Sequence, residues 1–428
     1  MMYCWVFLQY PSLPFSYAGT CIPMKPLTTV FFMKSWIAQL MEHPGLSGIG
    51  QNIGEYNVPY MLFLAIVGRT SFNDLYEIKN LSVLFDFLGS AAAVLLLSKI
   101  KGTKLLTPQN LLAYSVLLLV PNTFLNSAFW GQCDFIYVTF LLLCTYFLVK
   151  ENYPAAMIFY GIALAFKLQA IFFLPVLLIY YFASRKVNIL HFLWIPLVFF
   201  IMDLPAIIAG RGLSDTLNIY RAQTDIYKQL TMNCPNLFVF MPGDYELFSK
   251  LGIWTAFAIF MVSAFAIARQ GIRDNKQLVL LALWSAMVCI YFLPAMHERY
   301  VFICCIFSIL WAFLYRKDWW IAVGINFVTL LSSANYLFKV DIMEMKYLAL
   351  ANLVLLGAIT IRLFFQYPAV APVPATTPVT ESAPEVKPEG NRKSAKKSMH
   401  NANRLLMQSQ KAVFVLKHLL FAGQCVII

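Results

Sequence analysis

Long apolar runs recur along most of this chain, and they restrict its fold more than any other feature. From about residue 78 to residue 365 these runs are separated by short segments that carry charged residues. Runs of about 20 residues match the hydrocarbon thickness of a bilayer. Lipid leaves only helices or closed barrels as spanning structures, and the runs lack the alternation of barrel strands. The sequence therefore predicts an all-α, polytopic integral membrane protein.

The beginnings and ends of the runs predict where the helices lie. We expect about 11–12 membrane helices, some of them short or re-entrant. The apolar stretch 57–68 is too short to cross a bilayer, so we interpret it as re-entrant or interfacial. The rest of 24–77 and the segment 210–250 are expected to be loops. The main body is predicted to form helices near 78–98, 109–126, 133–149, 154–166, 169–183, 190–209, 251–270, 277–294, 300–315, 319–337 and 347–365.

The composition agrees with this class and excludes others. Of the 428 residues, 60% are hydrophobic and 12% are charged, which is unlike an ordinary soluble domain. The net charge of +12 is typical of cytoplasmic loops in a membrane protein, so no nucleic-acid partner is expected. The cysteines include no CxxC pair and the histidines do not cluster, so neither a zinc site nor a disulfide framework is indicated.

Three parts of the chain differ in composition. Residues 1–366 form the multi-pass part, although 1–22 is interrupted by Pro11 and Pro14, lacks a basic start and makes a poor first span or signal peptide. Residues 367–403 are rich in Pro, Ala and Thr and then basic, which is typical of a disordered cytoplasmic tail. Residues 404–428 are an apolar stretch to which we assign no role.

Basic residues predict how the helices are oriented. They follow the predicted helices that end near 98, 149, 183, 270, 315 and 365, so one orientation places all of these loops in the cytoplasm. This orientation requires residues 154–183 to form two short segments that return to the cytoplasm, in place of a single span through Lys167. Such segments are shorter than the bilayer, so Lys167 and Gln169 would lie in a cavity below the outer surface.

The same orientation brings several polar segments to the opposite, non-cytoplasmic side. Polar groups that converge on one side of a membrane protein are typical of a functional site. We therefore expect a site at the outer membrane boundary. The segments are 54–57, 130–134, 166–169, 210–250 and 297–299.

The basic residues among them have functional and structural interpretations. Arg299 and His297 could clamp a phosphate, but Glu298 and Arg299 could equally form an ion pair that anchors the interface. Lys167 with Gln169 could contact a phosphate or a sugar, while Lys167 could instead extend to the membrane surface.

The acidic residues also leave alternatives open. Asp134 opens a predicted helix, so it could be a first-turn acid favoured by the helix dipole, or it could accept the proton of a sugar hydroxyl. Glu55 precedes the stretch 57–68, and its carboxylate could face a cavity or solvent. Asp86 lies inside a predicted span, where it could be functional or could pair with Lys79.

Five short segments, taken in order, resemble GT-C-type membrane glycosyltransferases. The likeness is to bacterial mannosyltransferases related to the second mannosyltransferase of GPI-anchor synthesis. No single segment is specific, but their order is, and they extend over roughly residues 36–315. They are Gly-Glu-Tyr-Asn-Val-Pro-Tyr at 54–60, Ile-Lys through Phe-Asp at 78–86, Trp-Gly-Gln-Cys-Asp at 130–134, Phe-Lys-Leu-Gln-Ala at 166–170, and Met-His-Glu-Arg-Tyr at 296–300.

The resemblance implies an inverting hexosyltransferase, with mannose as the expected sugar. Its donor would be a polyprenyl-phosphate-linked sugar and its acceptor a glycan or glycolipid at the extracytoplasmic face. Glu55 and Asp134 are the candidate general bases. The basic groups would stabilise the departing lipid phosphate. No organic cofactor is implied, and a divalent cation is left open. The residues expected to bind substrate are Trp130, Gln132, Lys167, Gln169, His297, Glu298 and Arg299.

One departure from the family pattern keeps other functions open. Such enzymes carry an acid in the first outer loop, ahead of the segment matched here by Trp36, but residues 25–36 contain no Asp or Glu. Either the beginning of the chain is altered, or Glu55 or Asp134 replaces that acid, or the protein is an inactive relative. A transporter or flippase for a lipid-linked glycan is a further alternative, although no inverted repeat supports it. The expected location is the plasma membrane in a bacterium and the endoplasmic reticulum in a eukaryote.

Overall fold

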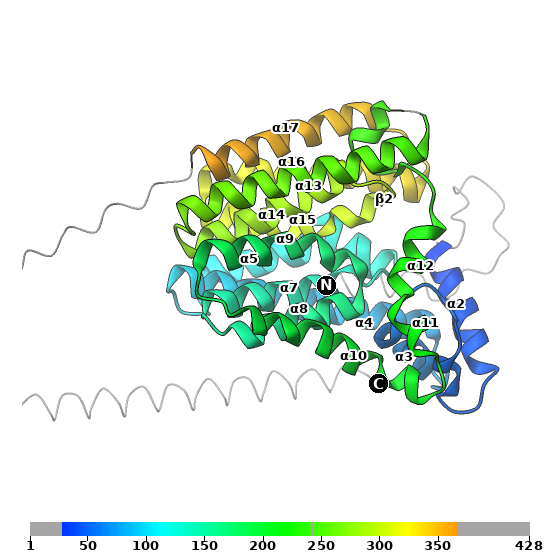
Figure 1. Cartoon of the computed structure of the whole chain (residues 1–428). Helices are drawn as coiled ribbons and strands as arrows, with labels where there is room; N and C mark the ends of the chain where they lie inside the picture. The colour runs from blue at the N-terminus through cyan, green and yellow to red at the C-terminus, as the bar shows by residue number, and fades with distance from the viewer. Residues whose placement is uncertain (1–27, 242, 367–428) are drawn as a thin grey trace, which may run out of the picture. The chain divides into compact units, whose positions relative to one another are not determined.

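A computed structural model describes residues 28–241 and 243–366, and helices make up most of this part of the chain (Figure 1). The strands among them are two residues long: β1 (Thr231–Met232) pairs in parallel with β2 (Met296–His297). The predicted all-α fold is therefore confirmed. The expectations for 1–22, 367–403 and 404–428 lie outside the described residues.

Every predicted helix of the main body is present, with boundaries that shift by a few residues. For example, α4 begins where Asn73 accepts a hydrogen bond from the backbone of Leu75, and it ends at Gly102 in the left-handed conformation. The helices are α4 (Asp74–Lys101), α5 (Pro108–Leu119), α6 (Pro121–Phe124), α7 (Asp134–Val149), α8 (Tyr153–Phe166), α9 (Leu174–Ser184), α10 (Trp194–Ile208), α13 (Tyr245–Gln270), α14 (Asn275–Phe292), α15 (Phe302–Leu314), α16 (Trp319–Phe338) and α17 (Met345–Phe364).

Some of these helices are long enough to cross a bilayer and others are short, as the sequence predicted. In the described ranges six have the length and apolar character for it, or seven if the pair 108–119 and 121–129, bent by 47°, is one span. The other predicted membrane helices include the short ones that the sequence analysis expected, such as α7, α8 and α9. Helices such as α7 and α8 are apolar but short, because polar residues interrupt the runs on either side.

The two short segments around Lys167 do return to the same end of the molecule. Lys167 has an extended backbone, which ends α8, and the chain continues as a 3-10 helix, η3 (Leu168–Phe173), into α9. At the far ends, Lys186 lies 2.6 Å from Glu151, and the rings of Tyr153 and Tyr180 are 6.3 Å apart. This part of the topology prediction is confirmed.

Short helices gather at the other end of the long ones (Figure 1), and the sequence had not predicted them. Residues 24–77 and 210–250 were expected to be loops, apart from 57–68, which is the helix α3 (Val58–Val67). They contain α2 (Thr28–Met41), η1 (Ser47–Gly50), α11 (Leu213–Leu217), α12 (Ile219–Ile226) and η5 (Leu237–Phe240), while α13 begins at Tyr245. The expectation of loops was wrong for these segments. Their mixed polar and apolar residues gave no clear helical pattern, and the short helices are stabilised by packing on neighbouring elements.

Burial separates helices that look equally apolar in sequence. Within the most apolar part of α14, 83% of the residues are buried inside the protein, whereas the corresponding values are 22% for α13 and 11% for residues 189–208, which contain α10. α14 therefore forms the centre of the core, and it packs against α15 and α17. α10 and α13 direct most of their apolar side chains outward, as helices in contact with lipid do.

Candidate functional site

An unusual turn places the first part of the site. After Pro121 the helix widens into a π-helix over Leu125–Phe129, and the backbone of Trp130 donates to the carbonyl of Leu125. Gly131 then adopts φ +73°, a conformation that side-chain-bearing residues rarely adopt. The chain reverses within a few residues, and Asp134 becomes the first residue of α7.

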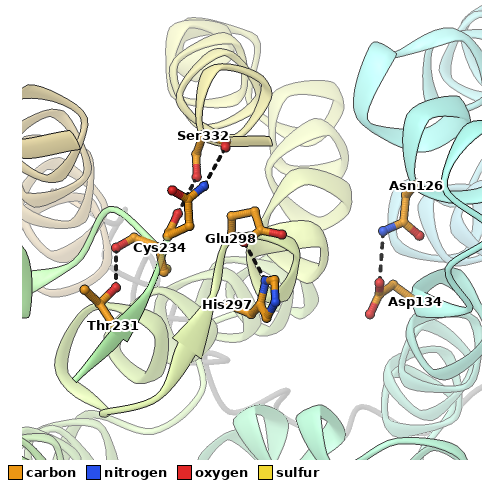
Figure 2. Close-up of polar contacts among 8 residues, drawn as sticks. Asn126, Asp134, Thr231, Cys234, His297, Glu298 and Ser332 are labelled. Carbon is orange, nitrogen blue, oxygen red and sulfur yellow. Dashed lines mark hydrogen bonds and ion pairs between the residues drawn. The ribbon is translucent and has the colours of Figure 1, made fainter. Parts of the chain in front are cut away.

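Asp134 is a fully buried carboxylate whose two oxygens are both engaged. Lys167 Nζ lies 2.5 Å from Oδ1, and Asn126 Nδ2 donates to Oδ2 over 2.9 Å. Figure 2 shows the second of these contacts. Asp134 is in the first turn of α7, as one interpretation held, but its carboxylate is directed at Lys167 and Asn126. A buried ion pair of this kind is costly to break from one side.

Lys167 lies inside the protein, and the interpretation that it extends to the membrane surface is wrong. Its side chain is 6% exposed, and its ammonium group lies 5.6 Å from the ring of Tyr56 as well as beside Asp134. Because Lys167 ends α8 in an extended conformation, its side chain enters the space beside α7. The Tyr56 hydroxyl donates to Gln132 Oε1 over 3.4 Å. Gln169, two residues after Lys167, is also buried, and its Oε1 has no hydrogen-bond partner among the described residues.

Arg299 is positioned by aromatic rings. Its guanidinium lies 5.8 Å from the ring of Trp130 and 5.7 Å from that of Tyr300, and its Nε is shielded without a hydrogen-bond partner. Among the described residues no carboxylate forms an ion pair with it. The expected ion pair between Glu298 and Arg299 is therefore wrong, because Glu298 contacts His297.

His297 and Glu298 form a buried pair held by a short parallel strand. His297 Nδ1 lies 2.5 Å from Glu298 Oε2 (Figure 2). Burial raises the pKa of Glu298 to about 8. Burial and the charge of Arg299 lower the pKa of His297 well below its usual value. Both shifts favour the uncharged forms of the two side chains, so His297 is not the cation that the sequence suggested.

The strand that carries His297 is fixed by the segment before α13. β1 pairs with β2, and Asn233, the residue after β1, forms hydrogen bonds with α16. Asn233 Nδ2 donates to the carbonyl of Ser332 over 3.0 Å, and the Ser332 hydroxyl donates to the carbonyl of Asn233 over 2.9 Å. Figure 2 shows Ser332 and Cys234 near His297 and Glu298, while Asn126 and Asp134 lie on a separate part of the chain.

Glu55 lies at a different point of the same end and is half-buried. Its Oε2 accepts a hydrogen bond from the Tyr227 hydroxyl over 3.2 Å, and Gln223 of α12 donates to its backbone carbonyl. Burial and the nearby Glu55 carboxylate raise the pKa of Tyr227 to about 12. In the described part of the chain Glu55 contacts Tyr227 and Gln223, whereas Asp134 contacts Lys167 and Asn126, so the structure separates the two candidate bases. The next residue in the chain, Tyr56, is the one whose ring lies beside the Lys167 ammonium group.

A small cavity opens beside Arg299. Its volume is about 20 Å³, which holds a water molecule but not a sugar ring. Arg299, Asn126 and Trp130 line it together with Asn122, Leu125, Phe302, Thr329, Ser333 and Leu337. A larger ligand would enter only after one of these side chains moves.

Asp86, from the sequence analysis, and Asp203 of α10 are two further acids that lie in other surroundings. Asp86 accepts a hydrogen bond from the hydroxyl of Ser127 in the π-helix. Asp203 accepts one from Asn57 Nδ2 over 3.0 Å. Asn126, Tyr56 and Tyr227 belong to the site but were not predicted, because their roles depend on which helices pack beside them. In the described part of the chain no group of three or more His, Cys, Asp or Glu residues is arranged to hold a metal ion.

The fold and the site define a class: an all-α polytopic membrane protein with a cluster of buried charged residues at one end of its helices. No protein-family model matches the chain, and no curated protein matches its sequence.

Proposed function

We propose that this protein transfers a hexose, with mannose as the first candidate, from a polyprenyl-phosphate carrier to a glycan or glycolipid. The transfer would take place at the extracytoplasmic face, with inversion at the anomeric carbon. The observation that carries the proposal is Arg299: a cation between two aromatic rings, without a described carboxylate partner, on the wall of a cavity.

Arg299 suits the phosphate of the donor. A guanidinium offers a planar pair of donors to phosphate oxygens, and positive charge stabilises the phosphate that departs when the sugar is transferred. The other buried cation, Lys167, is already neutralised by Asp134. The Trp130 ring is buried against Tyr336 and lines the same cavity, so a sugar would contact it only after a neighbouring side chain moves.

Glu55 is the better candidate for the general base. Its carboxylate is half-buried and receives one described hydrogen bond, from Tyr227, so it can accept a proton from an acceptor hydroxyl. Asp134 is fully enclosed and uses both oxygens on Lys167 and Asn126. We assign Asp134 the role of positioning Lys167.

The test is sugar transfer by the purified protein in proteoliposomes. We expect polyprenyl-phosphate-mannose and a mixed glycolipid acceptor to yield a mannosylated product. Arg299→Ala should lower kcat/KM by about 100-fold or more, whereas Arg269→Ala, at the opposite end of α13, should leave it unchanged. Folded wild-type protein that transfers no lipid-linked hexose would contradict the proposal. Movement of the donor across the bilayer without an acceptor would favour a flippase.

A further inference from the structure

Three basic side chains converge at the end of the helices away from the candidate site. Lys101 is the last residue of α4, Lys276 lies in the first turn of α14, and Arg316 follows α15 closely. α15 packs against both α4 and α14. The ends of α4, α14 and α15 that carry these residues therefore lie together, and their positive charges repel one another there.

The ammonium group of Lys101 lacks an acceptor among the described residues. Its Nζ is shielded from solvent and makes no hydrogen bond. Neither Lys101, Lys276 nor Arg316 forms an ion pair within the part of the chain that the structure describes. A shielded cation without an acceptor costs free energy, and two further positive charges beside it add to that cost.

The nearby acids are committed to other contacts. Asp318, two residues after Arg316, accepts hydrogen bonds from Arg362 Nε at 2.7 Å and Nη2 at 2.8 Å, and from Trp311 Nε1 at 2.9 Å. Asp274 caps α14 by accepting from the backbone of Gln277. The acceptor for Lys101 is therefore expected to come from outside the described chain.

The geometry points to a binding site for a phosphate-bearing anion formed by Lys101, Lys276 and Arg316. Phosphate oxygens can accept hydrogen bonds from all three cations. The guanidinium of Arg316 can donate to two phosphate oxygens at once. The N-terminus of α14, next to Lys276, adds a favourable helix dipole. The 18 residues of α14, about 27 Å of helix, lie between this end and the segment that leads to the candidate site, so the two sites are at opposite ends of α14. The phosphate could belong to a lipid headgroup or to a soluble compound.

The experiment measures thermal unfolding of the full-length protein in phosphatidylcholine nanodiscs. One arm adds phosphatidylglycerol to the bilayer, and the other adds inorganic pyrophosphate to the buffer. We expect one of the two anions to raise the unfolding midpoint of the wild type. Lys101→Gln should weaken the apparent binding of that anion about tenfold. The matched control is Lys104→Gln, an exposed lysine on the following loop, which should respond as the wild type does.

Each outcome decides the proposal. A response in the lipid arm alone identifies a headgroup site, and a response in the buffer arm alone identifies a site for soluble phosphate. The proposal is overturned if neither anion stabilises the wild type more than Lys101→Gln. In neutral lipid, Lys101→Gln should unfold at the same or a higher temperature, because it removes repulsion between like charges. A lower midpoint there would show that Lys101 has an acceptor within the protein, which also overturns the proposal.

Discussion

Asp134 and Glu55 are carboxylates at the same end of the molecule, but their surroundings differ. Asp134 is enclosed with Lys167 and Asn126, while Glu55 is half-buried beside Tyr227. Enclosure makes a charge depend on its partner for stability. Partial exposure leaves a carboxylate able to exchange protons with a substrate. The two residues therefore should respond differently to removal of their charge.

For Glu55→Gln we expect a large loss of activity and an unchanged fold. The variant keeps the shape and the hydrogen bond from Tyr227 but cannot accept a proton, so kcat should fall by about 100- to 10,000-fold. Transfer assays and thermal unfolding check the two parts. Full activity in this variant would remove Glu55 from the role of general base.

For Asp134→Asn we expect a loss of stability. The change leaves the Lys167 ammonium buried without a counter-charge, which should cost about 3–5 kcal/mol of unfolding free energy. Denaturant unfolding measures the loss. The double variant Asp134→Asn with Lys167→Met should recover part of it, because no unpaired charge then remains. A single variant as stable as the wild type would contradict the buried ion pair.

The His297–Glu298 pair predicts how stability depends on pH. Glu298 has a raised pKa of about 8, so stability falls as the pH rises from its unfolded value towards 8. His297 has a lowered pKa, so stability falls as the pH drops below about 6.5. Between roughly pH 4.5 and 6.5 the two slopes offset each other. We expect a plateau there and a decline towards pH 8.

Glu298→Gln isolates this effect. The amide is neutral at every pH, so the decline between about pH 6.5 and 8 should disappear while the decline at acidic pH persists. Unfolding midpoints measured across pH 4–9 check this. An unchanged slope above pH 6.5 would mean that Glu298 is ionised in the folded protein.

At the scale of elements, the turn between the π-helix and α7 determines where the site forms. Gly131 permits the reversal, and the wide π-helix directs Asn126 towards Asp134 and Ser127 towards Asp86. The sequence marked this turn by its Trp-Gly-Gln pattern. It did not indicate a π-helix, because that conformation depends on contacts with α4 and α7 that no local pattern records.

We expect Gly131→Ala to lower both stability and activity. Its left-handed backbone should cost about 1–2 kcal/mol with a side chain present, and the resulting shift should displace Asn126 and Trp130. The matched control is Gly102→Ala, with φ +63° and open space around it at the other end of α4. The control should lose similar stability but keep its activity. Equal losses of activity in both variants would contradict a specific role for the turn.

At the scale of the whole molecule, polar residues are divided between the two ends of the helices. The buried cluster around Asp134 lies at one end, and the ion pair between Lys186 and Glu151 lies at the other. The positive-inside rule assigns the second end to the cytoplasm.

Cysteine labelling tests this orientation. We expect Asp215→Cys to react with an impermeant maleimide from outside the cell, and Lys104→Cys to react only in inverted vesicles. Both positions are exposed, and each cysteine among the described residues is buried, so the unmodified protein provides the background. Labelling of both positions from the same side would overturn the orientation.

The sequence by itself determined the class of protein, the positions of the long helices and the segments that gather at one end. These follow from the length of apolar runs and the distribution of Lys and Arg, which act locally through the cost of placing polar groups in lipid. The same patterns missed α2, α11 and α12, whose helical structure depends on packing against neighbouring elements.

Only the tertiary structure decided which charges meet. Lys167 could have reached the membrane surface or a substrate, yet it pairs with Asp134, while Arg299 stacks on Trp130 and leaves Glu298 to His297. The physical reason is that a buried charge is stabilised by whichever group packing brings within a few ångströms. That neighbour comes from another helix and so is not encoded in any local pattern.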